Sequence, residues 1–217
     1  HIASCMAENG LTGPVIGVAL DGTGYGTDGT IWGGEFLVAD LKYFRRAAHF
    51  KHVPMPGGEE AVRHPARMAL AYVVEEFGPQ SPELALLDGA LSETERRLLA
   101  DMTARRLHSP LTSSAGRLFD AVAALVGLHE PISYEGQAAV RLQTLAMRAA
   151  ETPPYSFNLN AGAEGVLAID FGAMLRRIVA DLRAGRDRSH IASAFHHTLA
   201  EVVAETCVAI QEDEKLD

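Results

Sequence analysis

A short acidic, glycine-rich stretch, Asp21-Gly22-Thr23-Gly24, separates two apolar runs near the start of the chain. Glycine lets backbone N–H groups approach an oxyanion closely, and the hydroxyl of Thr23 supplies a further donor. The Asp21 carboxylate can hold a metal ion or order a water molecule beside the anion. This chemistry predicts a phosphate-binding hairpin, which differs from a phosphate loop between a strand and a helix. The alternative is an ordinary β-turn, because Asp-Gly is a common hairpin signal.

The residues around this stretch predict an antiparallel meander. Three runs rich in β-forming residues, at 15–20, 30–39 and about 42–50, are joined by short spacers with turn-forming side chains. Short spacers favour antiparallel neighbours, since a parallel pair needs a longer crossover. This arrangement would place residues 21–24 at the tip of the first hairpin.

A helical block is predicted from residue 59 to residue 150, apart from its loops. Apolar side chains recur there at helical spacing, and Pro65 is expected to restart a helix. Residues 92–95 show the capping-box pattern that begins a helix. Two more helices are expected over 112–126 and about 137–150.

The last part of the chain predicts a strand pair followed by two helices. The strands are expected at 155–160 and 166–169 around a turn at 161–165, and the helices at 170–183 and about 189–211. The element order indicates an α+β or α/β fold with an antiparallel β-meander, a long helical block, a small β-hairpin and C-terminal helices. We divide the chain into residues 1–53, 54–150 and 151–217 and expect these to be parts of one larger domain.

Composition excludes several classes of protein. Of the 217 residues 47% are apolar and 22% are charged, which is typical of a globular protein. The formal net charge of −9 argues against nucleic acid or an anionic membrane as the main partner. No apolar run is long enough for a membrane span, and the first residues lack the basic region of a signal peptide. Cys5 and Cys207 match no zinc or redox spacing, so a cytoplasmic location is expected for what we interpret as a piece of a longer protein.

Several strings along the chain resemble those of a known family. They are HIASCMAENG, VIGVALDGTGYGTDGTIWGGEFL, PMPGGEEAVRHPARMAL, LTSSAGRLFDAVAALVGL, YEGQAAVRL and FHHTLAEVVAETC. Together they span nearly the whole chain and resemble the Kae1-like (TsaD-like) carbamoyltransferase domain of HypF hydrogenase maturation proteins. The resemblance implies an actin/hexokinase/Hsp70-type (ASKHA) ATPase-like fold, related to the tRNA threonylcarbamoyl-transferases.

The resemblance also implies a reaction. Another domain would make carbamoyl-adenylate from carbamoyl phosphate and ATP. This domain would transfer the carbamoyl group to the C-terminal cysteine of a HypE-type partner, where dehydration yields the cyanide ligand of [NiFe]-hydrogenase. Carbonyl attack needs stabilisation of an oxyanion, and a metal ion would supply it.

The family pattern implies a metal site at the start of the chain. The second His of a His-x-x-x-His pair corresponds to His1, and the Asp of the glycine-rich stretch corresponds to Asp21. An imidazole and a carboxylate suit a divalent metal such as zinc or iron.

The same pattern implies a binding site for the carbamoyl-adenylate. In the glycine-rich stretch Gly22, Thr23 and Gly24 would face the phosphate. Gly116 and Asp120 match the nucleotide-contacting helix, where Asp120 is a candidate for the ribose hydroxyls. Gly136 stands where relatives have a glycine pair near the nucleotide. The neighbouring Arg117 stands where the tRNA-modifying relatives carry Glu, and the resemblance assigns it no role.

Other hypotheses stay open at this point. The family has a later phosphate loop, Gly-Gly-Val-Phe-Gln-Asn, and a last metal-binding Asp, and neither matches this sequence. We therefore expect the chain alone to lack a complete active site. The chemistry also suits a small-molecule O-carbamoyltransferase of the same fold. In a different class, the chain would be a structural or interaction module without ligand affinity. On the residues alone, the alternative for Asp120 is a solvated acid on a packed helix, and the other histidines are expected in surface or core positions.

Overall fold

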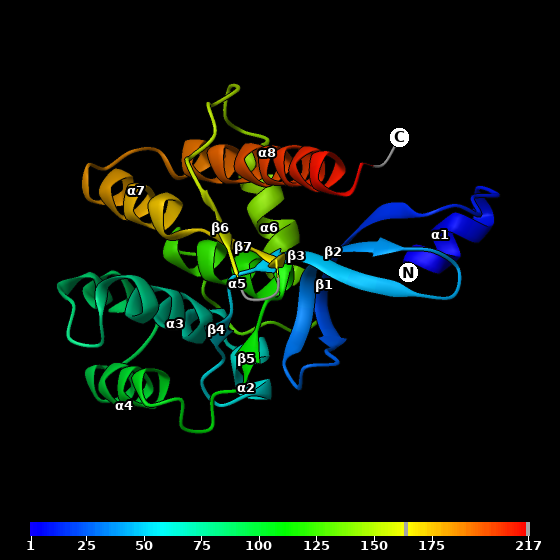
Figure 1. Ribbon diagram of the computed structural model, residues 1–217. Helices are drawn as coiled ribbons and strands as arrows, with labels where there is room; N and C mark the ends of the chain where they lie inside the picture. Colours follow the sequence, from blue (N-terminus) through cyan, green and yellow to red (C-terminus); the bar gives the residue numbers. More distant parts are fainter. Residues whose placement is uncertain (163–164, 216–217) are drawn as a thin grey trace.

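The computed structural model describes residues 1–162 and 165–215. A seven-stranded sheet forms its centre, with strand order β4-β5-β2-β3-β7-β6 and with β1 paired to β2 outside that order (Figure 1). The strands are β1 (Val15–Tyr25), β2 (Ile31–Ala39), β3 (Phe44–Phe50), β4 (Val53–Pro54), β5 (Leu111–Thr112), β6 (Asn158–Ala161) and β7 (Leu167–Asp170). The helices are α1 (Ile2–Glu8), α2 (Glu59–Arg63), α3 (Pro65–Phe77), the 3-10 helix η1 (Pro82–Leu87), α4 (Glu93–Ala104), α5 (Ala115–Leu125), α6 (Gln137–Ala146), α7 (Gly172–Arg183) and α8 (Arg188–Glu214).

The predicted meander is confirmed, but its first tip was placed wrongly. Strands β1, β2 and β3 pair antiparallel in chain order. The turn between β1 and β2 uses the second Asp-Gly pair, where the Asp28 carboxylate accepts from Thr30 N at 3.0 Å. Gly29 has a φ of +79°, a conformation that glycine adopts without strain. Residues 21–24 therefore lie inside β1, several residues before the tip.

The helical block is confirmed in α2 to α6, with two corrections. Helix α3 restarts at Pro65, and α4 begins with the expected capping box. Helix α5 begins at residue 115 instead of 112, because Thr112 pairs with the sheet in β5 and Ser114 caps the helix. Helix α6 ends at residue 146 instead of 150.

The second strand pair is also confirmed and belongs to the main sheet, but its first strand begins at residue 158 instead of 155. Strands β6 and β7 form an antiparallel pair, and β7 continues the sheet by pairing parallel to β3. Residues 163–164 of the predicted turn lie outside the described part of the chain. Helices α7 and α8 follow close to their expected ranges.

One hydrophobic core joins the sheet to the helices. It includes Phe36 of β2, Ala48 and Phe50 of β3, Leu118 of α5 and Phe195 of α8. Most helices gather on one side of the molecule, while β1 and β2 extend away from them with α1 alongside (Figure 1). Burial of this apolar surface is the main stabilising contribution to the fold.

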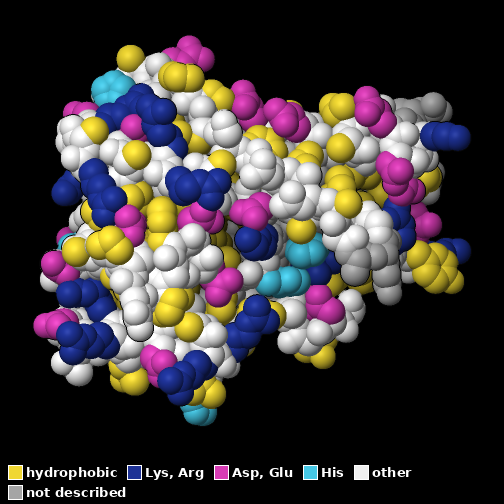
Figure 2. Space-filling model, turned by 60° about the vertical axis from the view of Figure 1, so that its left-hand side comes forward, with side chains coloured by type: hydrophobic (Ala, Val, Ile, Leu, Met, Phe, Trp, Pro, Cys, Tyr) yellow, Lys and Arg dark blue, Asp and Glu magenta, His cyan; other side chains and the backbone are white. Residues whose placement is uncertain are grey.

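The surface of the described residues shows mixed charge. On the face drawn in Figure 2, acidic, basic and hydrophobic side chains are interspersed. Within the described residues, no helix combines the length and apolar character needed to cross a membrane.

Candidate functional site

A bulge in β1 is the centre of the candidate site. Leu20 pairs with Gly34 and Gly24 pairs with Trp32, so residues 21–23 lie opposite the single residue Gly33. A bulge of this kind bends the strand and re-aims its backbone groups, and bulges are frequent next to active sites. The glycine-rich stretch therefore has a special backbone geometry, although it is not a hairpin tip.

The bulge is attached directly to the start of α5. Ser114 Oγ lies 2.9 Å from the carbonyl oxygen of Asp21 and 2.8 Å from that of Gly22, and it accepts from Arg117 N at 3.2 Å. A Cβ on Gly116 would lie only 2.8 Å from the Cα of Gly22, so this approach requires glycine. The N-terminus of α5 is a favourable environment for an anion at the bulge.

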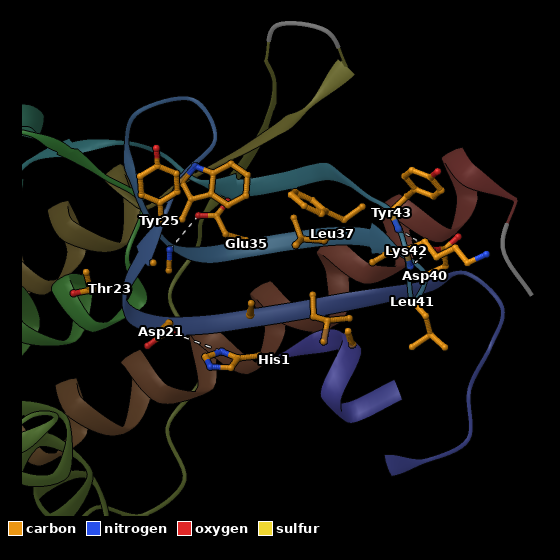
Figure 3. Close-up of a pocket in the computed structure, with 18 residues that line it drawn as sticks. His1, Asp21, Thr23, Tyr25, Glu35, Leu37, Asp40, Leu41, Lys42 and Tyr43 are labelled. Atoms are coloured by element: carbon orange, nitrogen blue, oxygen red, sulfur yellow. Dashed lines mark hydrogen bonds and ion pairs between the residues drawn. The ribbon is translucent and has the colours of Figure 1, made fainter. Parts of the chain in front are cut away.

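The two predicted metal ligands lie next to each other. His1 Nδ1 is 3.6 Å from Asp21 Oδ2, and Figure 3 shows the two side chains pointing toward one another. Their donor types fit zinc or iron. No third His, Cys, Asp or Glu joins them in a metal-binding group within residues 1–162 and 165–215. The pair can therefore supply part of a coordination sphere.

A cavity of about 570 Å³ opens on the side of the bulge where His1 lies. Its lining includes His1, Asp21, Thr23, Gly24 and Glu35. Figure 3 shows how the cavity continues along β2 past Leu37 toward Tyr43. Thr23 and Gly24 thus face this cavity together with the candidate metal ligands.

A buried carboxylate beside this cavity was not identified from the sequence. Glu35 Oε2 accepts from Arg46 Nε at 2.6 Å, and Glu35 Oε1 accepts from the backbone of Gly33 at 3.2 Å and from Ser113 Oγ. Arg46 also lies over the ring of Trp32, with 4.3 Å between the guanidinium carbon and the ring centroid. Two of these partners, Arg46 and Ser113, lie 11 and 78 residues from Glu35 in sequence, so no local pattern marks the network.

The guanidinium of Arg46 connects this carboxylate to the hairpin tip. Arg46 Nη1 lies 2.9 Å from Asp28 Oδ2. Burial alone would raise the pKa of Asp28, but hydrogen bonds from Thr30 and Trp32 outweigh it and lower the pKa to about 2. The Asp28 carboxylate therefore carries a negative charge at the hairpin tip, and its hydrogen bonds hold it in place.

A second, smaller cavity of about 220 Å³ lies on the other side of the bulge. It brings together the predicted nucleotide contacts Gly22, Gly116, Asp120 and Gly136, which come from β1, from α5 and from the residue before α6. Asp21 lines both cavities. The structure thus divides the predicted residues into two groups that share one carboxylate.

Asp120 has the strongest electrostatic perturbation in the second cavity. Burial raises its pKa to about 6, although the nearby Arg117 guanidinium acts in the opposite direction. Arg117 Nη2 lies 2.9 Å from Asp120 Oδ2. The carboxylate is therefore mostly ionised at neutral pH, and it is not the solvated surface acid of the alternative hypothesis.

Two histidines form a pair that the sequence interpretation missed. The rings of His49 and His52 are 4.7 Å apart, and burial lowers the pKa of both, to about 4 for His52. His49 Nδ1 lies 2.8 Å from Phe50 O, and His52 Nε2 lies 3.2 Å from Thr30 Oγ1. Both rings therefore have structural contacts at the end of β3.

Comparison with known families relates the chain to carbamoyltransferases. The model of the family described as "Carbamoyltransferase, Kae1-like Domain, second subdomain" matches residues 17–217. Carbamoyltransferase HypF of Synechocystis sp. is 36% identical over an alignment of 217 residues. The alignment covers 94% of this chain and 28% of the relative. The carbamoyltransferase HypF homolog of Cupriavidus necator is 39% identical over 211 residues, covering 94% of this chain and 52% of that protein.

Solved structures of HypF also resemble this chain. The crystal structure of full-length HypF in the phosphate- and nucleotide-bound form has a TM-score of 0.89 and 38% identity, covering 100% of this chain and 33% of that one. The structure of T. kodakarensis HypF has a TM-score of 0.81 and 30% identity, covering 28% of its chain. The mixed α/β fold expected from the sequence is confirmed. The chain spans between 28% and 52% of the length of these relatives.

Proposed function

The chain belongs to the carbamoyltransferase family with a Kae1-like domain, and from this premise we propose that it forms part of the carbamoyl-transfer site of a HypF-type hydrogenase maturation protein. The donor would be carbamoyl-adenylate, made elsewhere in the longer protein from carbamoyl phosphate and ATP. The acceptor would be the C-terminal cysteine of a HypE-type partner. This assignment implies a cytoplasmic protein.

A single observation carries the proposal: the β1 bulge separates two cavities, and Asp21 lines both. A transfer reaction needs a donor and an acceptor on two sides of one reacting group. The smaller cavity, with Asp120 and Gly136, suits the nucleotide part of the donor. The larger cavity, with His1 and Thr23, suits the carbamoyl group and the incoming thiolate.

The residues at the bulge would orient the donor for attack. Backbone N–H groups around Gly22 and Gly24 would bind the phosphate oxygens, supported by the N-terminus of α5. The N–H of Gly22 donates to Asp21 Oδ1 at 2.7 Å in this structure and would exchange that acceptor for the phosphate. The thiolate would attack the carbamoyl carbon and form a C–S bond, while the C–O bond to the phosphate would break and AMP would leave. Positioning of this kind lowers the barrier by making the reacting groups effectively intramolecular.

His1 and Asp21 would hold a divalent metal ion together with further ligands. Such an ion, when bound, polarises a carbonyl oxygen and stabilises the charge that develops on it. The 3.6 Å separation of the two side chains is compatible with both reaching one ion after small rotations. The residues present thus fit zinc or iron in donor type.

Reconstitution tests the proposal. The full-length protein is incubated with a HypE-type protein, carbamoyl phosphate and ATP, and the partner is analysed by mass spectrometry. We expect one carbamoyl group on the C-terminal cysteine, and none when that cysteine is replaced by alanine. A parallel reaction with small hydroxyl acceptors addresses the O-carbamoyltransferase alternative. Carbamoylation of those acceptors, without modification of the cysteine, would overturn the proposal.

A further inference from the structure

Glu35 of β2 is a buried carboxylate whose two oxygens both accept hydrogen bonds from the protein itself. Only 3% of the residue is exposed. Oε2 accepts from Arg46 Nε at 2.6 Å. Oε1 accepts from the backbone N–H groups of Gly33 at 3.2 Å and Gly34 at 3.4 Å, and from Ser113 Oγ. Such contacts make a buried charge tolerable, and they connect groups from three different segments of the chain.

The groups that Glu35 holds are in contact with the backbone of Asp21. Gly33 lies opposite the bulge, and a Cβ on Gly33 would be only 2.5 Å from the carbonyl oxygen of Asp21. Ser113 precedes Ser114, whose Oγ lies 2.9 Å from the same carbonyl oxygen. Figure 3 shows Glu35 beside the strand that carries Asp21. One oxygen of Glu35 therefore ties together the two segments that pack on the Asp21 backbone.

Arg46 of β3 holds Glu35 in this orientation. Besides its contact with Glu35, Arg46 Nη2 lies 3.3 Å from Ser113 Oγ and Nη1 lies 2.9 Å from Asp28 Oδ2. The guanidinium carbon is 4.3 Å from the centroid of the Trp32 ring. A guanidinium presents its donors in a fixed plane, so a lysine cannot make the same set of contacts. The two side chains thus connect the hairpin tip to the bulge.

The direction of the Asp21 side chain depends on this backbone. The N–H of Gly22 donates to Asp21 Oδ1 at 2.7 Å, so the carboxylate and the neighbouring N–H group change direction together when the backbone moves. In the proposed function Asp21 acts through a metal ion and Gly22 acts on the phosphate. Misplacement of reacting groups by about 1 Å can lower a rate by about 100-fold. The hold on the bulge therefore matters for the reaction as well as for stability.

We propose that Glu35 and Arg46 are positioning residues for carbamoyl transfer, which hold the β1 bulge in the conformation that directs Asp21 and Gly22 at the donor. They act through the backbone of the bulge and bind no substrate themselves. This inference rests on the proposed function and extends it to residues outside the predicted metal and nucleotide contacts.

Steady-state kinetics of the full-length protein test the proposal with Glu35→Gln. Glutamine keeps the shape of the side chain but has a single acceptor oxygen, which cannot serve both Arg46 and Gly33. Carbamoylation of the partner cysteine is followed by mass spectrometry over a range of partner concentrations. We expect kcat to fall by about 10-fold or more while the KM for the partner stays within about twofold, because positioning acts in the transition state. Arg46→Lys should have the same kind of effect, since it keeps the charge but loses the planar set of donors.

Hydrogen–deuterium exchange gives a second readout that needs neither substrate nor partner. Peptides covering residues 20–25 are followed by mass spectrometry in the parent protein and in the variants. We expect faster exchange at these residues in Glu35→Gln and in Arg46→Lys, because a bulge that is held less firmly opens more often.

A matched control removes a buried carboxylate elsewhere. Asp181 on α7 is 6% exposed and accepts from Tyr155 Oη, Arg177 Nε and Arg186 Nη1, each at 2.9 Å. It lines neither of the two cavities. Asp181→Asn should lower the stability of the protein, yet it should keep the parental kcat and the parental exchange at residues 20–25.

A second control breaks an exposed ion pair. Arg105→Met on α4 removes the partner of Asp101, which lies 2.8 Å away. This variant should keep the parental kcat, KM and exchange. Thermal unfolding of every variant gives the temperatures at which it is folded, and the kinetics are measured below them.

The outcomes separate this inference from the proposed function. A parental kcat in folded Glu35→Gln and Arg46→Lys would overturn the inference, while transfer by the parent protein would leave the proposed function intact. Unchanged exchange at residues 20–25 would overturn the hold of Glu35 on the bulge. An equal loss of kcat in Asp181→Asn would show a general effect of stability and would also overturn the inference. Absence of transfer by the parent protein would overturn the proposed function and the inference with it.

Discussion

Two ion pairs with a buried carboxylate flank the β1 bulge, and they differ in how completely they are hydrogen-bonded. Glu35 and Arg46 sit beside the larger cavity, where backbone N–H groups, Ser113 and Asp28 complete their contacts. Arg117 and Asp120 sit at the smaller cavity, where three of their polar atoms make no hydrogen bond within the described part of the chain, although Asp120 Oδ2 lies 2.9 Å from Arg117 Nη2. Burial of charge alone therefore does not identify a binding site. The incomplete pair is the one that we expect to bind a ligand.

Breaking the Glu35–Arg46 pair should have the larger effect on stability. Glu35→Ala removes the carboxylate that Arg46 and Ser113 contact and leaves the guanidinium largely buried without it. We expect the free energy of unfolding to fall by about 3–5 kcal/mol, the cost of breaking a buried pair on one side. Urea unfolding followed by circular dichroism measures this change. A loss similar to that of an exposed pair, such as Arg105→Met, would show that the network contributes little.

The Arg117–Asp120 pair should change how the stability of the protein depends on pH. Asp120 has a pKa of about 6 in the folded protein and about 3.9 when unfolded, so the folded state holds the proton more tightly. Its contribution to stability is therefore present below about pH 4 and is lost as the pH rises through about 6, by about 3 kcal/mol.

Comparison with Asp120→Asn isolates this contribution. The lowered pKa of Asp28 acts in the opposite direction, because stability from that carboxylate is lost on acidification. The difference in unfolding free energy between parent and Asp120→Asn should therefore change between pH 4 and pH 6. A difference that stays constant over this range would contradict the raised pKa and weaken the contrast between the two pairs.

Removing the attachment between the bulge and α5 should have a smaller effect on the free energy of unfolding. Ser114→Ala removes the helix cap and the hydrogen bonds to the carbonyls of Asp21 and Gly22. We expect a loss of about 1–2 kcal/mol in urea unfolding, typical of a lost N-cap. Ser92→Ala at the cap of α4 is the control, since it removes a cap without touching the bulge. Reduced ADP affinity in Ser114→Ala but not in Ser92→Ala would link the cap to the site.

Local patterns predicted the elements well, and nonlocal contacts account for the errors. The capping box at residues 92–95 and the restart at Pro65 depend on neighbours in sequence, and both are confirmed. The hairpin tip was misplaced because two Asp-Gly pairs compete and only the packed sheet shows which one turns. Strand β5 was missed because its two residues are held by β2 and β4.

The candidate site shows the same limit. The sequence resemblance indicated His1, Asp21 and Asp120, whose positions in the two cavities are now described. It gave no signal for Glu35, since its partner Ser113 is 78 residues away. The spacing of Arg117 and Asp120 is visible in the sequence, but their burial and missing partners depend on the bulge packed against α5.

The most direct test of the central claim is Asp21→Ala in the full-length protein. We expect carbamoylation of the partner cysteine, measured by mass spectrometry, to fall by a factor of about a hundred or more, because the developing oxyanion loses its stabilisation. Adenylate formation, followed by ATP consumption, should continue. Asp101→Ala, at an exposed position on α4, and His196→Ala on α8 should retain transfer near the parental rate. Transfer at the parental rate by Asp21→Ala would contradict the account, and the bulge would then be only a feature of the fold.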